Sequence, residues 1–356
     1  MAIGYDYGNA RLRARKARLF RREDYEGLLA AEGIDGVISA LSQSPYGDEI
    51  SAALVIHRGF SCVAEALRRN FAAEMRRMRT FYEGQPQALL DRVLTRWDIF
   101  SLKGILRGRA AGIPTEEIME TVVPAGRLHE AELEEIAQQP TLRASIELIA
   151  TWRLPFAPIL VGELESYQRT EDLAMMALAL DRYYYDTALQ GLVGNGNVEM
   201  VREVLETEID VANIMAVLRL VSSGVAAQEL EERFQARDFL PILIASGQTV
   251  SYDRLSSLEA SASFEQVLAA LEGTALGRIL RAEEAQDLVS IENGLDRHLV
   301  EKGVGFLRRD PLGMGVPLGY IWAKRNEIVN LRVLAQGKVR ELSEERIREQ
   351  LFLPLG

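Results

Sequence analysis

Three stretches of the chain share one pattern of apolar and polar positions, at residues 98–107, 210–219 and 327–336. Each begins with an acid, has Ser or Asn three places later, and carries apolar residues at offsets 1, 4, 7 and 8 from the acid. Apolar side chains spaced in this way form one stripe on the surface of an α-helix. The pattern therefore predicts three amphipathic helices with the same polar residues at corresponding places.

The polar residues that define these helices are called the signature residues below: Asp98, Arg107, Asp210, Asn213, Arg219, Glu327 and Asn330. Two roles are open for the acids. They could each contribute one carboxylate to a shared site for a cation or a cationic partner. Alternatively, each acid lies in the first turn of its helix, where free amides and the helix dipole stabilise a carboxylate by roughly 0.3–1 kcal/mol. We favour the second role, and expect Asn213 and Asn330 to form hydrogen bonds between helices.

The copies differ at two polar positions, where Ser101 replaces Asn and Gln336 replaces Arg. Glycines predict where the three helices end, because glycine adopts the left-handed conformation of a helix cap at little cost. Gly112 and Gly224 both stand at offset 14 from the acid, whereas the third helix is predicted to end earlier, at Gly337.

Two further landmarks precede each signature helix in the same order. The first is a pair of short amphipathic helices, and the second is a longer helix. The pairs are predicted around residues 24–41, 133–149 and 252–271, and the longer helices contain Leu67, Leu180 and Leu295. The signature acid follows these leucines by 31, 30 and 32 residues, which makes an internal triplication a strong prediction.

The acids are separated by 112 and 117 residues, a period too long for tetratricopeptide, HEAT or ankyrin units. Each copy is therefore expected to be a small helical domain, with boundaries at 1–115, 116–228 and 229–356. No sustained alternation of apolar and polar residues predicts strands. We expect an all-α protein, and three tandem copies could close into a ring-like body around an axial partner. Such a body suits a coupler or adaptor better than an enzyme.

Composition supports a folded protein, with 48% hydrophobic and 26% charged residues among 356. The single cysteine, Cys62, lies in an apolar helical pattern and is expected in the core of a protein from a reducing compartment. We find neither a signal peptide nor an apolar window of about 20 residues. The net charge of −11 is divided as +5, −12 and −4 over residues 1–112, 113–224 and 225–356. This distribution disfavours nucleic-acid binding and permits a protein partner with complementary charge.

The first predicted helix runs from Ala10 to about Arg22, with Asn9 as its N-cap. Its many arginines are interpreted as a solvated face rather than as a phosphate-binding arm. The three histidines, His57, His129 and His298, have no metal-ligand spacing. Phosphate-binding loops and nucleophile motifs are missing from the sequence as well. We therefore predict no catalytic residue, no cofactor, no metal and no direct nucleotide binding.

Five stretches of the sequence also carry a family resemblance, at residues 7–13, 44–47, 98–107, 208–214 and 320–332. Through them the chain resembles the C subunit of the bacterial and archaeal V/A-type rotary ATPases, a relative of the d subunit of eukaryotic V-ATPases. The resemblance covers nearly the whole chain and is most specific in the last stretch.

The resemblance implies a funnel of three helical bundles related by pseudo-three-fold symmetry. It implies a non-catalytic rotor socket that receives the D and F subunits of the central shaft and rests on the membrane proteolipid ring. Such a protein transmits torque for proton or sodium transport, and is cytoplasmic and peripheral to the membrane. Two alternatives remain: a soluble helical adaptor or scaffold, and a metal- or phosphate-dependent helical enzyme, which has no support beyond the number of acids.

Overall fold

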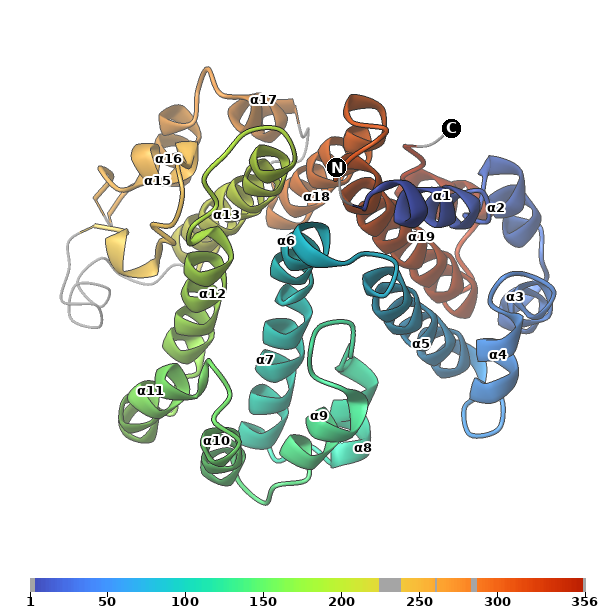
Figure 1. Cartoon of the computed structure of the whole chain (residues 1–356), viewed down its shortest axis with the longest axis horizontal. Helices are drawn as coiled ribbons and strands as arrows, with labels where there is room; N and C mark the ends of the chain where they lie inside the picture. The colour runs from blue at the N-terminus through green and yellow to red at the C-terminus, as the bar shows by residue number, and fades with distance from the viewer. Residues whose placement is uncertain (1–3, 224–237, 260, 283–286, 355–356) are drawn as a thin grey trace. The chain divides into compact units, whose positions relative to one another are not determined.

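The computed structural model describes residues 4–223, 238–259, 261–282 and 287–354. Within these ranges the regular elements are helices, and the only β pairing is an isolated bridge between Asp238 and Glu259 (Figure 1). The protein is therefore all-α, as the patterning predicts.

The chain divides into two compact units, Met1–Leu154 with Lys302–Gly356, and Pro155–Glu301. The helices of the first unit are α1 (Asp6–Lys16), α2 (Arg22–Leu29), α3 (Gly33–Ser42), α4 (Gly47–Ala53), α5 (Gly59–Arg79), α6 (Gly84–Leu94), α7 (Arg96–Ala110), α8 (Thr115–Thr121), α9 (Glu130–Ala137), α10 (Leu142–Thr151), α19 (Gly315–Val339) and α20 (Glu344–Gln350).

The second unit contains α11 (Ala157–Thr170), α12 (Ala174–Leu189), α13 (Asn197–Ser222), the 3-10 helix η1 (Leu240–Ile242), α15 (Val250–Leu255), α16 (Phe264–Ala270) and α17 (Ala275–Ala282). Helix α18 (Leu288–Arg309) begins in this unit, and the division between the units falls within it. The three predicted pairs of short helices are confirmed as α2 with α3, α9 with α10, and α15 with α16.

The three signature stretches lie in α7, α13 and α19, and their apolar stripe is buried as predicted. The residues at offsets 4 and 7 are at most 1% exposed: Leu102, Ile105, Ile214, Val217, Leu331 and Leu334. Each stripe faces a group of short helices. Helix α7 packs against α8, α9 and α10, α13 packs against α15 and α16, and α19 packs against α3 and α20.

The stripes of α19 and α13 join separate cores. In the first unit, Leu331 and Leu334 of α19 join apolar side chains of α2, α3, α4 and α5, among them the fully buried Cys62. In the second unit, α13 contributes Ile214 and Val217 to a core shared with α15, α16, α17 and α18. Cys62 is a core residue, as expected, and its burial raises the pKa of its thiol. The division into three domains stays a prediction.

The ends of the signature helices correct one expectation. Gly112 follows α7 with a φ of +66°, and Ile113 donates a hydrogen bond back to Gly108, so this glycine caps the helix as predicted. The prediction for the third helix is wrong, because α19 continues past Gly337 to Val339. Its left-handed residue is Glu341, with a φ of +53°, which stands at offset 14 as Gly112 does. Gly224 lies outside the described residues.

Gly337 has a packing role instead. A Cβ at this position would lie 2.6 Å from a side-chain carbon of Ile347 in α20, closer than van der Waals contact allows. Gly108 has the corresponding relation to Ile118 of α8, at 2.4 Å. These two glycines each stand ten residues after the signature acid, and allow the following short helix to approach closely.

The N-terminal helix also differs from the expectation. Asn9 is not an N-cap, because α1 begins at Asp6 and ends at Lys16. Its buried amide donates to the carbonyls of Leu312 and Gly313, and its oxygen accepts from the Tyr82 hydroxyl. The side chain of Asn9 thus forms tertiary contacts with residues distant in the sequence. The local sequence pattern cannot distinguish an Asn in this role from an N-cap.

Candidate functional site

The residue three places after each signature acid forms the same pair of hydrogen bonds in all three copies. Its side chain accepts from the N–H and donates to the C=O of a single downstream residue, over distances of 2.7–3.1 Å. The pairs, called the signature clamps below, are Ser101 with Val123, Asn213 with Ile244, and Asn330 with Phe352.

The clamps hold extended backbone that follows a short helix. The residues preceding the clamped ones, Val122, Leu243 and Leu351, all have extended backbone angles. An Asn side chain donates to the backbone C=O through its amide nitrogen and accepts from the backbone N–H through its amide oxygen, whereas the Ser101 hydroxyl donates and accepts with one oxygen. The replacement of Asn by Ser in the first copy therefore preserves the clamp. The expected bonds between helices are present as well: Asn213 also donates to Ser251 of α15, and the Asn330 side chain is a hydrogen-bond partner of Tyr25 in α2.

Each signature acid accepts backbone N–H groups from another segment. Asp98 accepts from Arg127 and Leu128, both at 2.9 Å, just before α9. Asp210 accepts from Ser251 in α15, and Glu327 accepts from Phe20 just before α2.

The predicted stabilisation of these acids by their own helix dipoles is wrong for two of them. Asp98 does lie in the first turn of α7, but Asp210 and Glu327 lie well inside α13 and α19. The acids instead fix the start of a short helix to the signature helix. Among the described residues, no group of three or more His, Cys, Asp or Glu side chains is arranged to hold a metal ion.

Asp98 has a perturbed acidity. Burial raises its pKa from 3.8 to about 6, although the two N–H donors, from Arg127 and Leu128, act in the opposite direction by stabilising the carboxylate. The chain passes so close to this carboxylate that a Cβ on Gly126 would lie 2.2 Å from Asp98 Oδ1.

Glu327 belongs to a buried polar cluster on α19. Lys324 Nζ donates to Glu327 Oε1 at 2.9 Å and to the Tyr46 hydroxyl at 2.8 Å, and Tyr46 donates to the same carboxylate oxygen. All three residues are at most 5% exposed. Burial and the Glu327 carboxylate raise the pKa of Tyr46 well above its ordinary value. The charge of Glu327 is therefore matched by Lys324 inside the protein.

The two signature arginines do not form the same contacts. Arg107 is exposed on α7. Arg219 is also exposed, and forms an ion pair with Glu292 of α18 at 2.6 Å. Exposed pairs of this kind contribute little to stability. The geometry that the three copies share thus lies in the acid and in the Ser or Asn, not in the terminal arginine.

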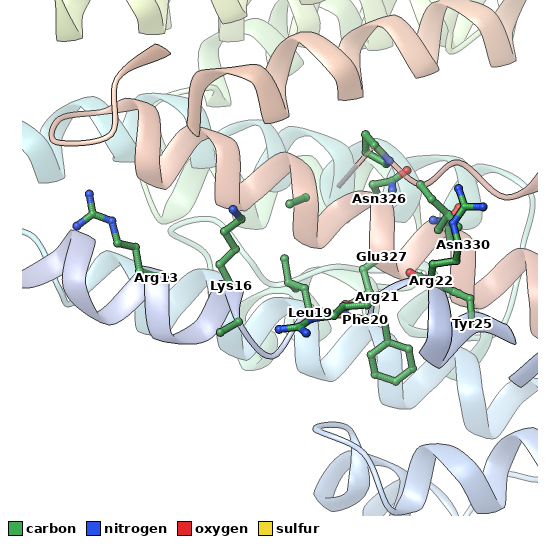
Figure 2. A pocket seen from close by; sticks show the side chains of 14 residues that line it. Arg13, Lys16, Leu19, Phe20, Arg21, Arg22, Tyr25, Asn326, Glu327 and Asn330 are labelled. Carbon is green, nitrogen blue, oxygen red and sulfur yellow. The ribbon is translucent and has the colours of Figure 1, made fainter. Parts of the chain in front are cut away.

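A pocket of about 460 Å³ opens beside Glu327 and Asn330 (Figure 2). Its lining comes from α1, from the connection between α1 and α2, from α2, from α19 and from the segment after α20. Four of the lining residues are cationic: Arg13, Lys16, Arg21 and Arg22. Lys16 points from α1 toward α19 in Figure 2.

Sequence reasoning identified Glu327 and Asn330 but missed Phe20, Lys324 and the pocket. The partners of Glu327 lie up to 307 residues away, so periodicity within α19 could not reveal them. One local signal was available, because Lys324 and Glu327 are three residues apart and therefore on one helix face.

Comparison with known proteins adds an independent line of evidence. The model of the ATP synthase (C/AC39) subunit family matches residues 8–350. The chain is 28% identical to the A-type ATP synthase C subunit of Methanosarcina barkeri, over 98% of this chain and 93% of that protein. It is 26% identical to the C subunit of the A-type ATP synthase of Methanocaldococcus jannaschii, over 98% and 86% of the two chains. The corresponding protein of Methanococcoides burtonii is 28% identical, over 98% and 94%.

Proposed function

The chain belongs to the ATP synthase (C/AC39) subunit family, and on this premise we propose that it is the rotor socket of a V/A-type rotary ATPase. In this role it joins the D and F subunits of the central shaft to the membrane proteolipid ring and transmits torque for ion transport. It performs no catalysis itself. The observation that carries the proposal is the family match over residues 8–350, with relatives named as C subunits of A-type ATP synthases over nearly the whole chain.

The chemistry of the signature residues supports a mechanical role. A part that transmits torque has to resist bending, and densely packed helices with satisfied buried polar groups are stiff. The signature acids and clamps use their hydrogen-bonding capacity on the protein's own backbone. Asp98, for example, holds two N–H groups, and Asn330 holds both polar groups of Phe352. This use of polar residues fits a scaffold.

Exposed apolar side chains supply surfaces that partner proteins would cover. Val55 and Ile56, at the turn between α4 and α5, are 78% and 74% exposed. Leu312, before α19, and Val193, before α13, are also largely exposed. Because contiguous exposed apolar surface indicates a protein contact, the adjacent Val55 and Ile56 are the stronger candidate. Within the described residues no helix is both long and apolar enough to cross a bilayer. In the proposed role the chain is attached to the membrane through the proteolipid ring.

The proposal is tested by affinity purification of the tagged chain from solubilised membranes of its native host. We expect the shaft proteins and the proteolipid to co-purify, and the chain to sediment with membranes before solubilisation. Recovery of a soluble helical partner, with all of the chain in the supernatant, would instead support the adaptor function.

A matched pair of variants tests the contact surfaces. Val55→Asp with Ile56→Asp places two charges on the exposed turn, and is expected to reduce recovery of one partner class without unfolding the chain. Glu23→Lys, a change at another exposed position, on α2, is the control. Equal losses in both variants would show that the turn is not a contact surface.

A further inference from the structure

The pocket lies beside the acid and the clamp of the third copy, and in the first copy the chain itself connects the residues held by the corresponding acid and clamp. There, Ser101 clamps Val123 and Asp98 holds Leu128, and the residues between the two held points run directly over the acid. Ala125 is buried in this linking segment, and Gly126 passes within contact distance of Asp98. The second copy is also continuous, from Ile244 at the clamp to Ser251 at the acid.

In the third copy the acid and the clamp also hold one residue each, but no short stretch of chain connects these two residues. Asn330 clamps Phe352, while Glu327 holds Phe20, which is 332 positions earlier in the sequence. The pocket lies between these points. Its lining includes Leu353 and Pro354, which follow the clamped Phe352, and Leu19, Phe20 and Arg21, which surround the residue held by Glu327. The pocket therefore has the position of a short peptide segment.

The charges around the pocket favour an acidic peptide over a neutral or basic one. Arg13, Lys16, Arg21 and Arg22 line it, and the acid among its described lining residues, Glu327, is neutralised by Lys324. The site therefore has a surplus of positive charge, and clusters of Arg and Lys recognise acidic motifs. The volume of about 460 Å³ is within the roughly 300–1,000 Å³ of ligand sites and exceeds the space that a single small anion needs.

We propose that this pocket binds a short, extended, acidic peptide segment supplied by another polypeptide. The peptide takes the place of the missing link, with its backbone between Leu353 and Phe20. Its carboxylates face Lys16, Arg21 and Arg22. The proposal goes beyond the rotor function, because it assigns a ligand class to a defined cavity in the first unit.

The test uses the isolated full chain and two fluorescein-labelled peptides. One has the sequence Pro-Ala-Gly-Asp-Asp, which copies residues 124–126 and adds two acids, and the other is Pro-Ala-Gly-Asn-Asn. Fluorescence anisotropy measures binding. We expect the acidic peptide to bind at least about tenfold more tightly than the amide peptide. This preference should vanish at ~1 M salt, where the Debye length is about 3 Å.

Charge reversals locate the site. Lys16→Glu and Arg22→Glu should each weaken binding of the acidic peptide by about tenfold. Arg18→Glu is the control, because Arg18 is an exposed residue between α1 and α2 that does not line the pocket, and its reversal changes the net charge equally. Circular dichroism confirms that all three variants keep their helical content.

Three results would overturn the proposal: equal affinity for the two peptides, an equal loss of affinity in the Arg18→Glu variant, or displacement of the peptide by inorganic phosphate at matching concentration. The last would identify a site for small anions. Because the isolated chain is used, none of these results depends on whether the chain assembles with a rotary ATPase.

Discussion

Removal of the clamp in the third copy should loosen the segment after α20 by a predictable amount. Asn330 is 2% exposed, and its amide donates to the Phe352 carbonyl at 2.7 Å and accepts from the Phe352 N–H at 3.0 Å. Asn330→Ala removes both bonds. Each contributes about 1 kcal/mol net, so the loss is about 2 kcal/mol.

A neighbouring residue provides the matched control. Asn326 also donates to the Phe352 carbonyl, at 2.8 Å, whereas the Phe352 N–H is bound by Asn330. Asn326→Ala should therefore cost only about 1 kcal/mol, since the carbonyl keeps Asn330 as a donor. In the Asn330→Ala variant the carbonyl is likewise still satisfied, by Asn326, and the N–H alone loses its acceptor.

Amide hydrogen exchange is the appropriate assay, because the chain has two compact units and global unfolding need not be two-state. Protection of the Phe352 amide should fall by about 30-fold in Asn330→Ala, as about 2 kcal/mol requires. In Asn326→Ala it should fall much less. Unchanged protection in Asn330→Ala, or equal effects in the two variants, would refute the role of Asn330 as the clamp.

Three further predictions concern the other copies and the helix ends. The folded pKa of Asp98 is raised from 3.8 to about 6, so its contribution to the free energy of unfolding is present below pH 4 and is lost, by about 3 kcal/mol, as pH rises through 6. This dependence of stability on pH should be missing in Asp98→Asn. An Asp98 carboxyl that NMR shows to titrate below pH 4 would contradict the prediction. Glu341→Gly should stabilise the protein by about 0.5–1 kcal/mol in thermal unfolding, because Glu341 has a left-handed φ, whereas Gly112→Ala should destabilise it by a similar amount. Gly337→Ala should lower the free energy of unfolding by about 1–3 kcal/mol, because the new methyl group clashes with Ile347. In a double-mutant cycle, Ile347→Ala should relieve this clash and give a favourable coupling energy with Gly337→Ala, and additive losses would exclude the contact.

Helical periodicity predicted the stripes of the signature helices because burial of a helix face depends on local spacing. Leu102 and Leu331 are buried at offset 4 for the same reason, although their helices lie in different surroundings. The all-α class and the order of short and long helices follow from the same signal. The family resemblance found in the sequence is confirmed by the family match over residues 8–350.

Local patterns failed where distant segments decide. Asn9 has the residue type and position of an N-cap, but its partners are Tyr82 and residues more than 300 positions away. Glu341 does not look like a helix terminator, yet it has the left-handed conformation after α19, and Leu342 donates a hydrogen bond back to Gly337. The pocket beside Glu327 depends on the meeting of segments from both ends of the chain, which no window of sequence contains.

The bond between Phe20 and Glu327 has a consequence for biosynthesis, because the two residues are 307 positions apart. At about 5–20 residues per second, a ribosome takes about 15–60 s to add the intervening chain. During that time the apolar faces of α2 and α3 have no α19 to cover them. Until α19 emerges, the nascent polypeptide therefore exposes apolar surface that the folded protein buries, and we expect exposed surface of this kind to favour aggregation.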